Sequence, residues 1–184
     1  GGIGHYTKGY YYDELITQKK VCLYDIDPER LKKADGQYGS RGIRQLLQID
    51  NTRKNEEWHS DSIKSSLESW QYPLHFIDFE TYTGAIPYHH IMRPYEVIAF
   101  QWSCHTIDHP GADPVHSEFL NEEYNFPNFR FAKTLMAQIG ESGTPFMWST
   151  FENTILRDVL HQIESFNHED IILKNWLLIH PLLI

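Results

Sequence analysis

Two acidic residues near the middle of the chain are spaced so that they can act together. Asp78 and Glu80 lie in residues 73–81, where alternating apolar residues, aromatics and an initial proline are typical of a strand. Side chains at positions i and i+2 of a strand share one face, so both carboxylates are expected to point the same way. They repel each other unless a cation lies between them, and carboxylate oxygens suit Mg²⁺ or Mn²⁺. The spacing alone leaves open a solvated strand end, where both acids are simply hydrated.

Length and composition limit what the chain can be. Its 184 residues include ample apolar and aromatic content for a packed core, and no apolar run is long enough to span a bilayer. We therefore expect one domain with an appendage, and no membrane partner. The two cysteines, Cys22 and Cys104, are far apart in sequence and form no metal-type pair, which favours a reduced, cytoplasmic setting.

The charge is distributed unevenly along the chain. Residues 1–70 hold 11 of the 16 basic and 11 of the 25 acidic residues, so residues 71–184 carry the whole net charge of −9. An acidic domain is a poor electrostatic match for nucleic acid. Bound cations or a basic neighbouring domain would have to compensate if the chain acts on a polyanion.

The order of the predicted elements indicates an α/β fold. We expect residues 1–70 to form a linker and helical appendage, and residues 71–184 to form the main domain. In that domain the patterns predict strands at 73–81, 95–107, 115–120 and 145–148, with helices at 126–139 and 151–163. This order is typical of a mixed sheet flanked by helices. Because the chain closes on an apolar stretch at 182–184, we expect the C-terminal part of the domain to be missing.

The motif Ile-Asp-Phe-Glu-Thr at 77–81 resembles the first motif of the DEDD (DnaQ-like) 3′–5′ exonucleases of the ribonuclease H-like superfamily. Residues 72–105 are similar to a domain-of-unknown-function family of that superfamily, which often lies C-terminal to a RecB-like nuclease domain in bacterial proteins. The resemblance covers about residues 60–165. It implies a ribonuclease H-like, mixed five-stranded sheet flanked by helices. It also implies a single-stranded DNA or RNA 3′ end as substrate and a RecB-like nuclease domain or protein as partner.

The resemblance also implies a set of site residues. Phe151-Glu152 matches the second motif of these exonucleases, so Asp78, Glu80 and Glu152 are the implied catalytic and metal-binding residues, with Mg²⁺ or Mn²⁺ as cofactor. Trp148 stands where asparagine is usual. A different interpretation of Glu152 is a capping box with Ser149 at the start of a helix. The third motif's aspartate is not found: its expected place is near 179–181, so the fourth carboxylate either lies beyond the chain's end or is lacking.

In the implied mechanism, two cations about 3.5–4 Å apart straddle the scissile phosphate. Thr81 and Tyr82 would lie beside the terminal nucleotide, and Gln101 and His105 would reach the substrate from the neighbouring strand. For His105, a structural histidine within the sheet is the alternative. For Trp148 and Trp102, the alternatives are base stacking and core packing.

Three functions stay open at this level. The resemblance favours metal-dependent 3′–5′ exonuclease-like hydrolysis of nucleic-acid phosphodiester bonds. Because one carboxylate is not found, the chain is alternatively an inactive ribonuclease H-like scaffold or accessory domain of a larger nuclease. A metal-dependent phosphohydrolase of small phosphoesters is the third hypothesis.

Overall fold

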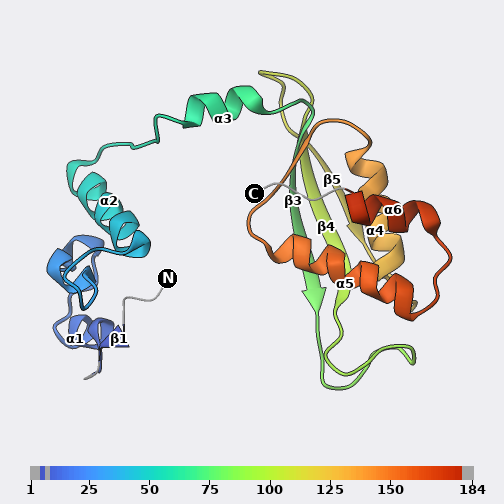
Figure 1. Cartoon of the computed structure of the whole chain (residues 1–184), viewed down its shortest axis with the longest axis horizontal. Helices are drawn as coiled ribbons and strands as arrows, with labels where there is room; N and C mark the ends of the chain where they lie inside the picture. The colour runs from blue at the N-terminus through green and yellow to red at the C-terminus, as the bar shows by residue number, and fades with distance from the viewer. Residues whose placement is uncertain (1–4, 7–8, 180–184) are drawn as a thin grey trace. The chain divides into compact units, whose positions relative to one another are not determined.

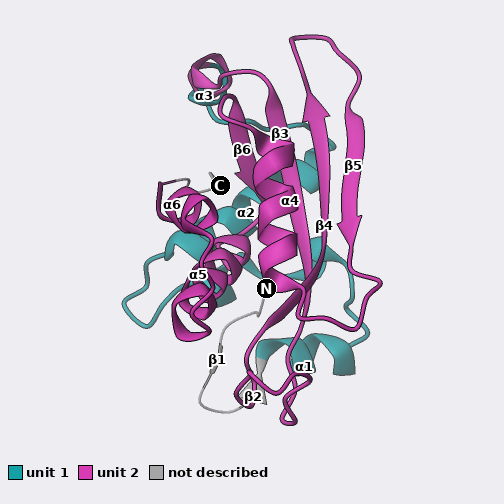
Figure 2. Ribbon diagram, turned by 90° about the vertical axis from the view of Figure 1, so that its right-hand side faces the viewer, with its two compact units in different colours: residues 1–64 teal, residues 65–184 magenta. Residues whose placement is uncertain are grey.

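A computed structural model describes residues 5–6 and 9–179 of the chain. The chain forms two compact units, residues 1–64 (unit 1) and residues 65–184 (unit 2), which Figure 2 shows in different colours. The sequence interpretation placed this division between residues 70 and 71. Helix α3 (Ile63–Ser69) crosses the division. We describe the two units separately.

Unit 1 consists of short elements around a small apolar core. Its two strands and its helices are β1 (His5–Tyr6), β2 (Gly9–Tyr10), α1 (Tyr11–Thr17), the 3₁₀ turns η1 (Leu23–Asp25) and η2 (Pro28–Leu31), and α2 (Ser40–Lys54). The core contains Tyr11, Leu15, Ile26 and Ile49.

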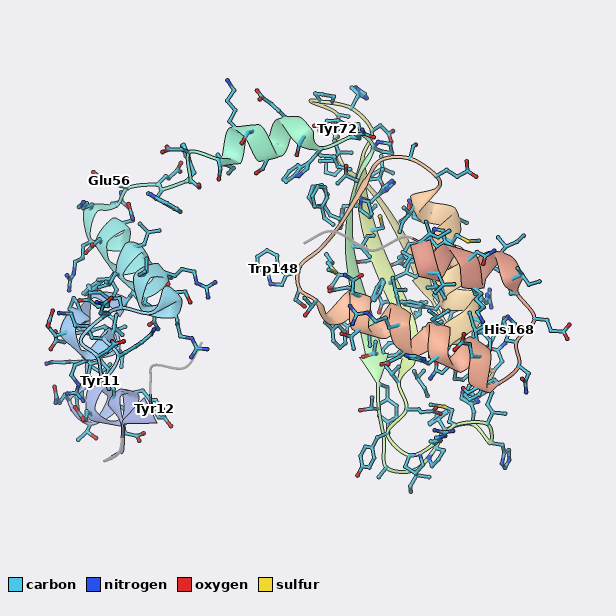
Figure 3. The ribbon with its side chains drawn as sticks, viewed as in Figure 1. Tyr11, Tyr12, Glu56, Tyr72, Trp148 and His168 are labelled. Carbon is cyan, nitrogen blue, oxygen red and sulfur yellow. The ribbon has the colours of Figure 1, made fainter. Side chains whose placement is uncertain are left out.

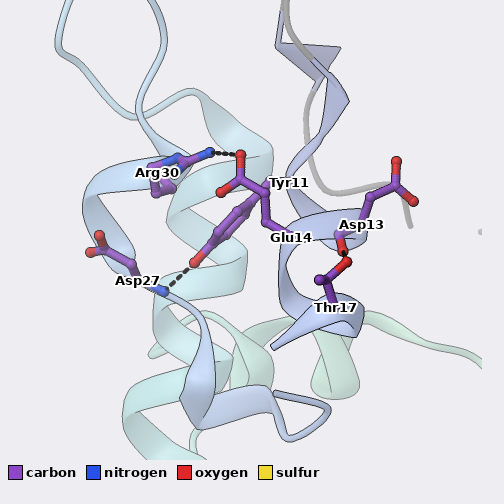
Figure 4. A network of polar contacts seen from close by, with 6 residues as sticks. All are labelled: Tyr11, Asp13, Glu14, Thr17, Asp27 and Arg30. Carbon is purple, nitrogen blue, oxygen red and sulfur yellow. Dashed lines mark hydrogen bonds and ion pairs between the residues drawn. The ribbon is translucent and has the colours of Figure 1, made fainter. Parts of the chain in front are cut away.

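Polar contacts around Tyr11 hold the short elements of unit 1 together. The backbone N–H of Asp27 donates to the Tyr11 hydroxyl at 2.7 Å, and the Arg30 guanidinium lies over the Tyr11 ring, 4.5 Å from its centroid. Arg30 also pairs with Glu14 at 2.9 Å (Figure 4). A single tyrosine therefore links α1 to the segment that carries η2.

Unit 2 is built on a mixed sheet of four strands. These are β3 (Leu74–Tyr82), β4 (Ile98–Ile107), β5 (Val115–Leu120) and β6 (Thr144–Met147), in the spatial order β5-β4-β3-β6. The pairs β3–β4 and β4–β5 are antiparallel, and β3–β6 is parallel. The expected α/β class and mixed sheet are confirmed.

The expectation of a fifth strand is wrong for the residues that the structure describes. The apolar segment after residue 170, whose type we did not predict, forms helix α6 (Ile171–Ile179). Leu173 and Trp176, three positions apart, are the residues that α6 buries, and this spacing places both on one side of a helix. A continuous apolar run does not distinguish a buried strand from a buried helix, so the sequence pattern could not decide here.

Three helices lie on one face of the sheet: α4 (Asn128–Ile139), α5 (Phe151–Ser165) and α6 (Figures 1 and 2). Among the described residues, no helix is both long enough and apolar enough to cross a membrane. The core between these helices and the sheet includes Ile77, Phe79, Trp102, Cys104, Phe131, Leu135, Ile155 and Val159. Trp102 is 3% exposed, so core packing is confirmed for this residue.

A β-bulge in β4 changes which side chains face the core. Glu80 pairs with Gln101, but the next residue, Thr81, pairs with Ala99, so Phe100 is an extra residue on β4. One inserted residue reverses the alternation beyond it. Strict alternation along the predicted strand at 95–107 places Ala99 on the same face as Gln101. That assignment is wrong, because Ala99 is fully buried in the core while Gln101 lies opposite the exposed Glu80.

A buried amide network fixes the start of α4 against β4 and α5. The Asn128 side chain accepts from Ala99 N at 2.8 Å and donates to Val97 O at 3.0 Å. It also donates to Gln162 Oε1 at 2.6 Å, and Gln162 in turn donates to Val97 O at 3.1 Å. Asn128 is fully buried, so all of these hydrogen bonds are shielded from water.

Replacing Asn128 by alanine is expected to lower the free energy of unfolding by about 2–4 kcal/mol, because the change leaves two buried polar groups, Ala99 N and Gln162 Oε1, without the partner that Asn128 provides. Urea denaturation of the purified chain measures this. Asn125→Ala, an exposed asparagine in the same connection, is the control and should change stability by less than about 0.5 kcal/mol. Equal effects of the two substitutions would contradict the role given to the network.

Burial lowers the pKa of His75, a residue of β3 that is 2% exposed and whose Nδ1 lies 3.0 Å from the Thr106 hydroxyl. The unfolded chain takes up this proton near pH 6.5, whereas the folded chain does so only at lower pH. The contribution of neutral His75 to the free energy of unfolding is therefore fully present above about pH 6.5. As the pH drops from there toward the folded-state pKa, the free energy of unfolding falls by up to about 1.4 kcal/mol per pH unit because of this residue.

His75→Gln should remove that part of the pH dependence. Urea unfolding of both proteins between pH 7 and pH 5 checks this, with the exposed His109→Gln as control. A wild-type slope that the His75 substitution leaves unchanged would refute the assignment.

Candidate metal centre

Asp78 and Glu80 lie on the open face of the central strand. Along β3, Ile77 and Phe79 are buried, whereas Phe76, Asp78 and Glu80 are exposed. The alternation follows from one-sided coverage, since α4, α5 and α6 pack against the Ile77 face only. The prediction that both carboxylates share a face is confirmed.

The neighbouring strands add polar side chains to this face. In the register of β3 with β4, Ser103 lies opposite Asp78, Gln101 opposite Glu80 and His105 opposite Phe76. Gln101 and His105 are therefore on the same face as the two acids, as the sequence predicted. His105 also contacts His116 of β5, with ring centroids 4.7 Å apart.

A cavity of about 340 Å³ lies beside Asp78. Its polar lining consists of Asp78, Ser103 and His105, and its apolar wall consists of Phe76, Ile77, Phe146, Met147 and Trp148. The rings of Phe76 and Phe146 are stacked, 5.1 Å apart, which stiffens that wall. A carboxylate, a hydroxyl and an imidazole thus open onto one small space.

Trp148 projects into solvent at the edge of this cavity. Its side chain is 92% exposed, and Figure 3 shows the indole standing away from the connection between β6 and α5. Core packing, one of the two interpretations of Trp148, is therefore wrong. The ring faces of an exposed tryptophan are free to stack on a planar ligand.

Glu152 is the third predicted ligand, and it is buried in the first turn of α5. It is 2% exposed, and its Oε2 atom has no hydrogen-bond partner within the described part of the chain. The capping-box interpretation fails, because α5 has no side-chain cap and Ser149 Oγ instead accepts from Phe151 N at 3.2 Å. A buried carboxylate oxygen without a hydrogen-bond partner is costly, so a donor or a cation at Oε2 would stabilise this arrangement.

The topology brings the start of α5 to the same level of the sheet as Asp78. β6 runs parallel to β3, and its last residue, Met147, pairs with Ile77. The chain therefore leaves the sheet beside Asp78 and begins α5 four residues later. Nevertheless, among residues 5–6 and 9–179 no three His, Cys, Asp or Glu side chains gather into a group that could hold a metal. The acids of β3 are adjacent, Glu152 is not joined to them in this arrangement, and the three-ligand site stays a prediction.

The remaining predicted residues lie beyond the bulge, in other cavities. Thr81 lines a cavity of about 850 Å³ along α5, together with Arg93, Asp158 and His161. Tyr82 lines a third cavity, described below. His180, near the place expected for the missing carboxylate, lies outside the described residues.

Sequence reasoning did not identify the group around Asp158. Burial raises the pKa of the Asp158 carboxyl above its usual range, although His161 and Arg157 oppose that rise. The i, i+3 spacing of Asp158 and His161 on a helix was the available signal, because it places both on one side of α5. That side carries Thr154 and Ile155 into the same cavity, while Glu152 lies on the buried side.

Comparison with known protein families matches residues 75–178, more than half of the chain, to the family described as Domain of unknown function (DUF2779). No curated protein and no solved structure gives a significant match. The match includes β3, β6 and the start of α5, and so all three predicted ligands.

The unpaired charge of Glu152 gives a thermodynamic prediction. In the presence of a chelator, Glu152→Gln should raise the free energy of unfolding by about 1 kcal/mol, because an amide of the same shape replaces a buried carboxylate whose Oε2 has no described partner. Mn²⁺ should stabilise the wild type and should not stabilise the variant. Thermal unfolding with and without Mn²⁺ measures both effects.

Glu118→Gln provides the matched control for this experiment. Glu118 is an exposed carboxylate on β5, opposite Ser103, so its substitution removes the same charge from the sheet without altering a buried group. Loss of stability in the Glu152 variant, or equal Mn²⁺ stabilisation of all three proteins, would be inconsistent with a cation at Glu152.

Proposed function

The chain belongs to the DUF2779 family, whose description gives no function. From the chain's own residues we propose metal-dependent, 3′–5′ exonuclease-like hydrolysis of phosphodiester bonds in single-stranded DNA or RNA. Asp78, Glu80 and Glu152 would bind Mg²⁺ or Mn²⁺. The proposal includes the finer fold assignment, a ribonuclease H-like domain.

The observation that carries this proposal is negative charge without a compensating cation. Asp78 and Glu80 lie side by side on an open sheet face, and Glu152 Oε2 is buried without a partner at the helix start beside the same strand. No described lysine or arginine forms an ion pair with any of the three. Oxygen donors of this kind suit a hard divalent cation, so the donor chemistry fits the implied metal.

The sheet topology gives independent support. The strand order β5-β4-β3-β6 has its first acidic motif on the central strand and its second at the helix that follows the parallel fourth strand. This is the arrangement that the resemblance to DEDD exonucleases implies for the first two motifs. Four strands are described, so the support extends to this part of the domain.

The protein side chains have distinct roles in the proposed reaction. A divalent cation, when bound, supplies an activated water and neutralises charge on the leaving oxygen. Asp78 would hold that cation beside the cavity that it shares with His105, and the His105 imidazole would hydrogen-bond to a water in the same space. Trp148 offers an exposed ring on which a terminal base can stack. Thr81, Tyr82 and Gln101 are proposed to contact the adjoining nucleotide.

Two observations favour a second candidate, a non-catalytic scaffold or accessory domain within a larger nuclease. The three carboxylates do not form an assembled metal-binding group among the described residues. The net charge of −9 also opposes binding of a polyanion by this chain alone. A basic partner, such as a RecB-like nuclease domain, would supply the missing positive charge.

Incubation of the full chain with Mn²⁺ and end-labelled single-stranded DNA or RNA tests the proposal. Wild type should shorten the substrate from its 3′ end, and Asp78→Asn should reduce the rate by at least about 100-fold, because the substitution removes a charged ligand without changing side-chain size. Glu118→Gln, which removes the same charge from the same face, should retain the activity within about threefold.

The other outcomes separate the alternatives. Shortening that survives Asp78→Asn would exclude the proposed site. An inert wild type would contradict the exonuclease proposal and favour the scaffold. Hydrolysis of a small phosphodiester such as bis-p-nitrophenyl phosphate, without any action on oligonucleotides, would instead indicate a phosphohydrolase of small esters.

A further inference from the structure

We infer that unit 2 contains a second ligand site, an aromatic cage for an alkylammonium group such as a lysine side chain or a polyamine. The site is a cavity of about 520 Å³ between the β3–β4 loop and the segment that follows β5. Tyr82, Tyr88, Phe100 and Tyr124 line it with aromatic rings, together with the imidazole of His89. The inference is independent of the proposed nuclease function.

Edge-to-face contacts fix the walls of the cage. The rings of Tyr82 and Tyr88 lie 6.4 Å apart at 76°, and those of Tyr88 and His89 lie 5.7 Å apart at 63°. His89 in turn packs at 90° against Phe126, just before α4. Ring pairs in this arrangement expose the negative face of one ring while its neighbour contributes an edge. A loop that would otherwise vary in conformation is thereby tied to the folded core.

The rim of the cavity is acidic. Glu122 and Glu123 both line it, and its described lining includes no lysine or arginine. Glu123 is engaged by Arg130 at 2.8 Å, whereas no described cation pairs with Glu122. A carboxylate beside several ring faces is the combination that attracts a cation, because both the charge and the ring quadrupoles favour it. The same rim disfavours a phosphate group inside the cavity, and Tyr82 is the one described lining residue that the proposed nuclease site also uses.

A buried acceptor narrows the ligand class. Asn121 lines the cavity, and its Oδ1 is buried without a described donor, while its Nδ2 donates to Glu123 O at 2.7 Å. A buried acceptor of this kind is costly unless it is satisfied. Exposure of this oxygen to the cavity would let an ammonium that carries N–H groups donate to it, as it also can to the Glu122 carboxylate, and a quaternary ammonium can donate to neither. The site therefore favours primary or secondary amines over tetramethylammonium.

Isothermal titration of the full chain with N-acetyl-lysine methylamide, spermidine and tetramethylammonium tests the inference. The first two should bind and the third should bind more weakly. N-acetyl-norleucine methylamide, which has a similar chain length without the charge, should not bind measurably. If spermidine binds more tightly than the lysine derivative, the ligand of the cavity is a free polyamine. If the lysine derivative binds more tightly, the ligand is a lysine side chain of a protein.

Variants of the exposed Tyr88 separate a cage from a merely apolar pocket. Tyr88→Leu should weaken amine binding by about tenfold, whereas Tyr88→Phe, which keeps the ring, should stay within about threefold. Glu122→Gln should weaken binding several-fold and reduce its dependence on salt. Circular dichroism of each variant confirms that the fold is retained.

Three results would overturn the inference: equal binding of the norleucine and lysine derivatives, unchanged amine binding by Tyr88→Leu, or no amine binding at all. Each of these outcomes can occur with the Asp78-dependent nuclease activity intact or absent, so the two proposals fail separately.

Discussion

A carboxylate oxygen removed from water is costly unless a donor or a cation meets it, and the proposed site depends on this constraint at Glu152, which is 2% exposed and whose Oε2 has no described partner. Its position is determined by the chain path, because the parallel pairing of β6 with β3 makes α5 begin beside Asp78. Helix capping does not account for it, since Ser149 bonds to Phe151 N instead. The proposed shared cation would give the buried carboxylate and the two acids of β3 a common explanation, although the three side chains do not form one metal-binding group among the described residues.

The helices cover only one face of the sheet, and this explains why the candidate functional side chains lie on the other face. Because α4, α5 and α6 bury the face that carries Ile77 and Phe79, the opposite face retains acids, a histidine and exposed aromatic rings without loss of core packing. The bulge at Phe100 then divides this region. On one side of it lies the cavity beside Asp78, and beyond it Tyr82 belongs to a separate cavity with an acidic rim. Two ligand chemistries can therefore coexist on one small sheet.

The parts of the fold that follow local periodicity were predictable from the sequence. The alternation of residues along β3 correctly predicted that Asp78 and Glu80 share one face of the sheet. The helical spacing of apolar residues correctly predicted that α5 begins at Phe151. The bulge was not predictable, because Ile98, Ala99 and Phe100 are all apolar, so an inserted residue there interrupts no alternation of polar and apolar residues. The fifth strand was implied by the resemblance alone, and the uniformly apolar run after residue 170 has no period that distinguishes a helix from a strand. The burial of Glu152 and the aromatic group around Tyr88 depend on contacts between distant segments, which no local pattern encodes.

The most direct test of the shared cation is a crystal structure of the full chain grown with Mn²⁺ and recorded at a wavelength where manganese scatters anomalously. The account predicts an anomalous peak about 2 Å from a carboxylate oxygen of Asp78 and from one of Glu152. The opposite result is a structure without such a peak, in which Glu152 Oε2 accepts a hydrogen bond from a protein donor. That result would mean that its burial has a purely structural cause and that the two acids of β3 are simply hydrated.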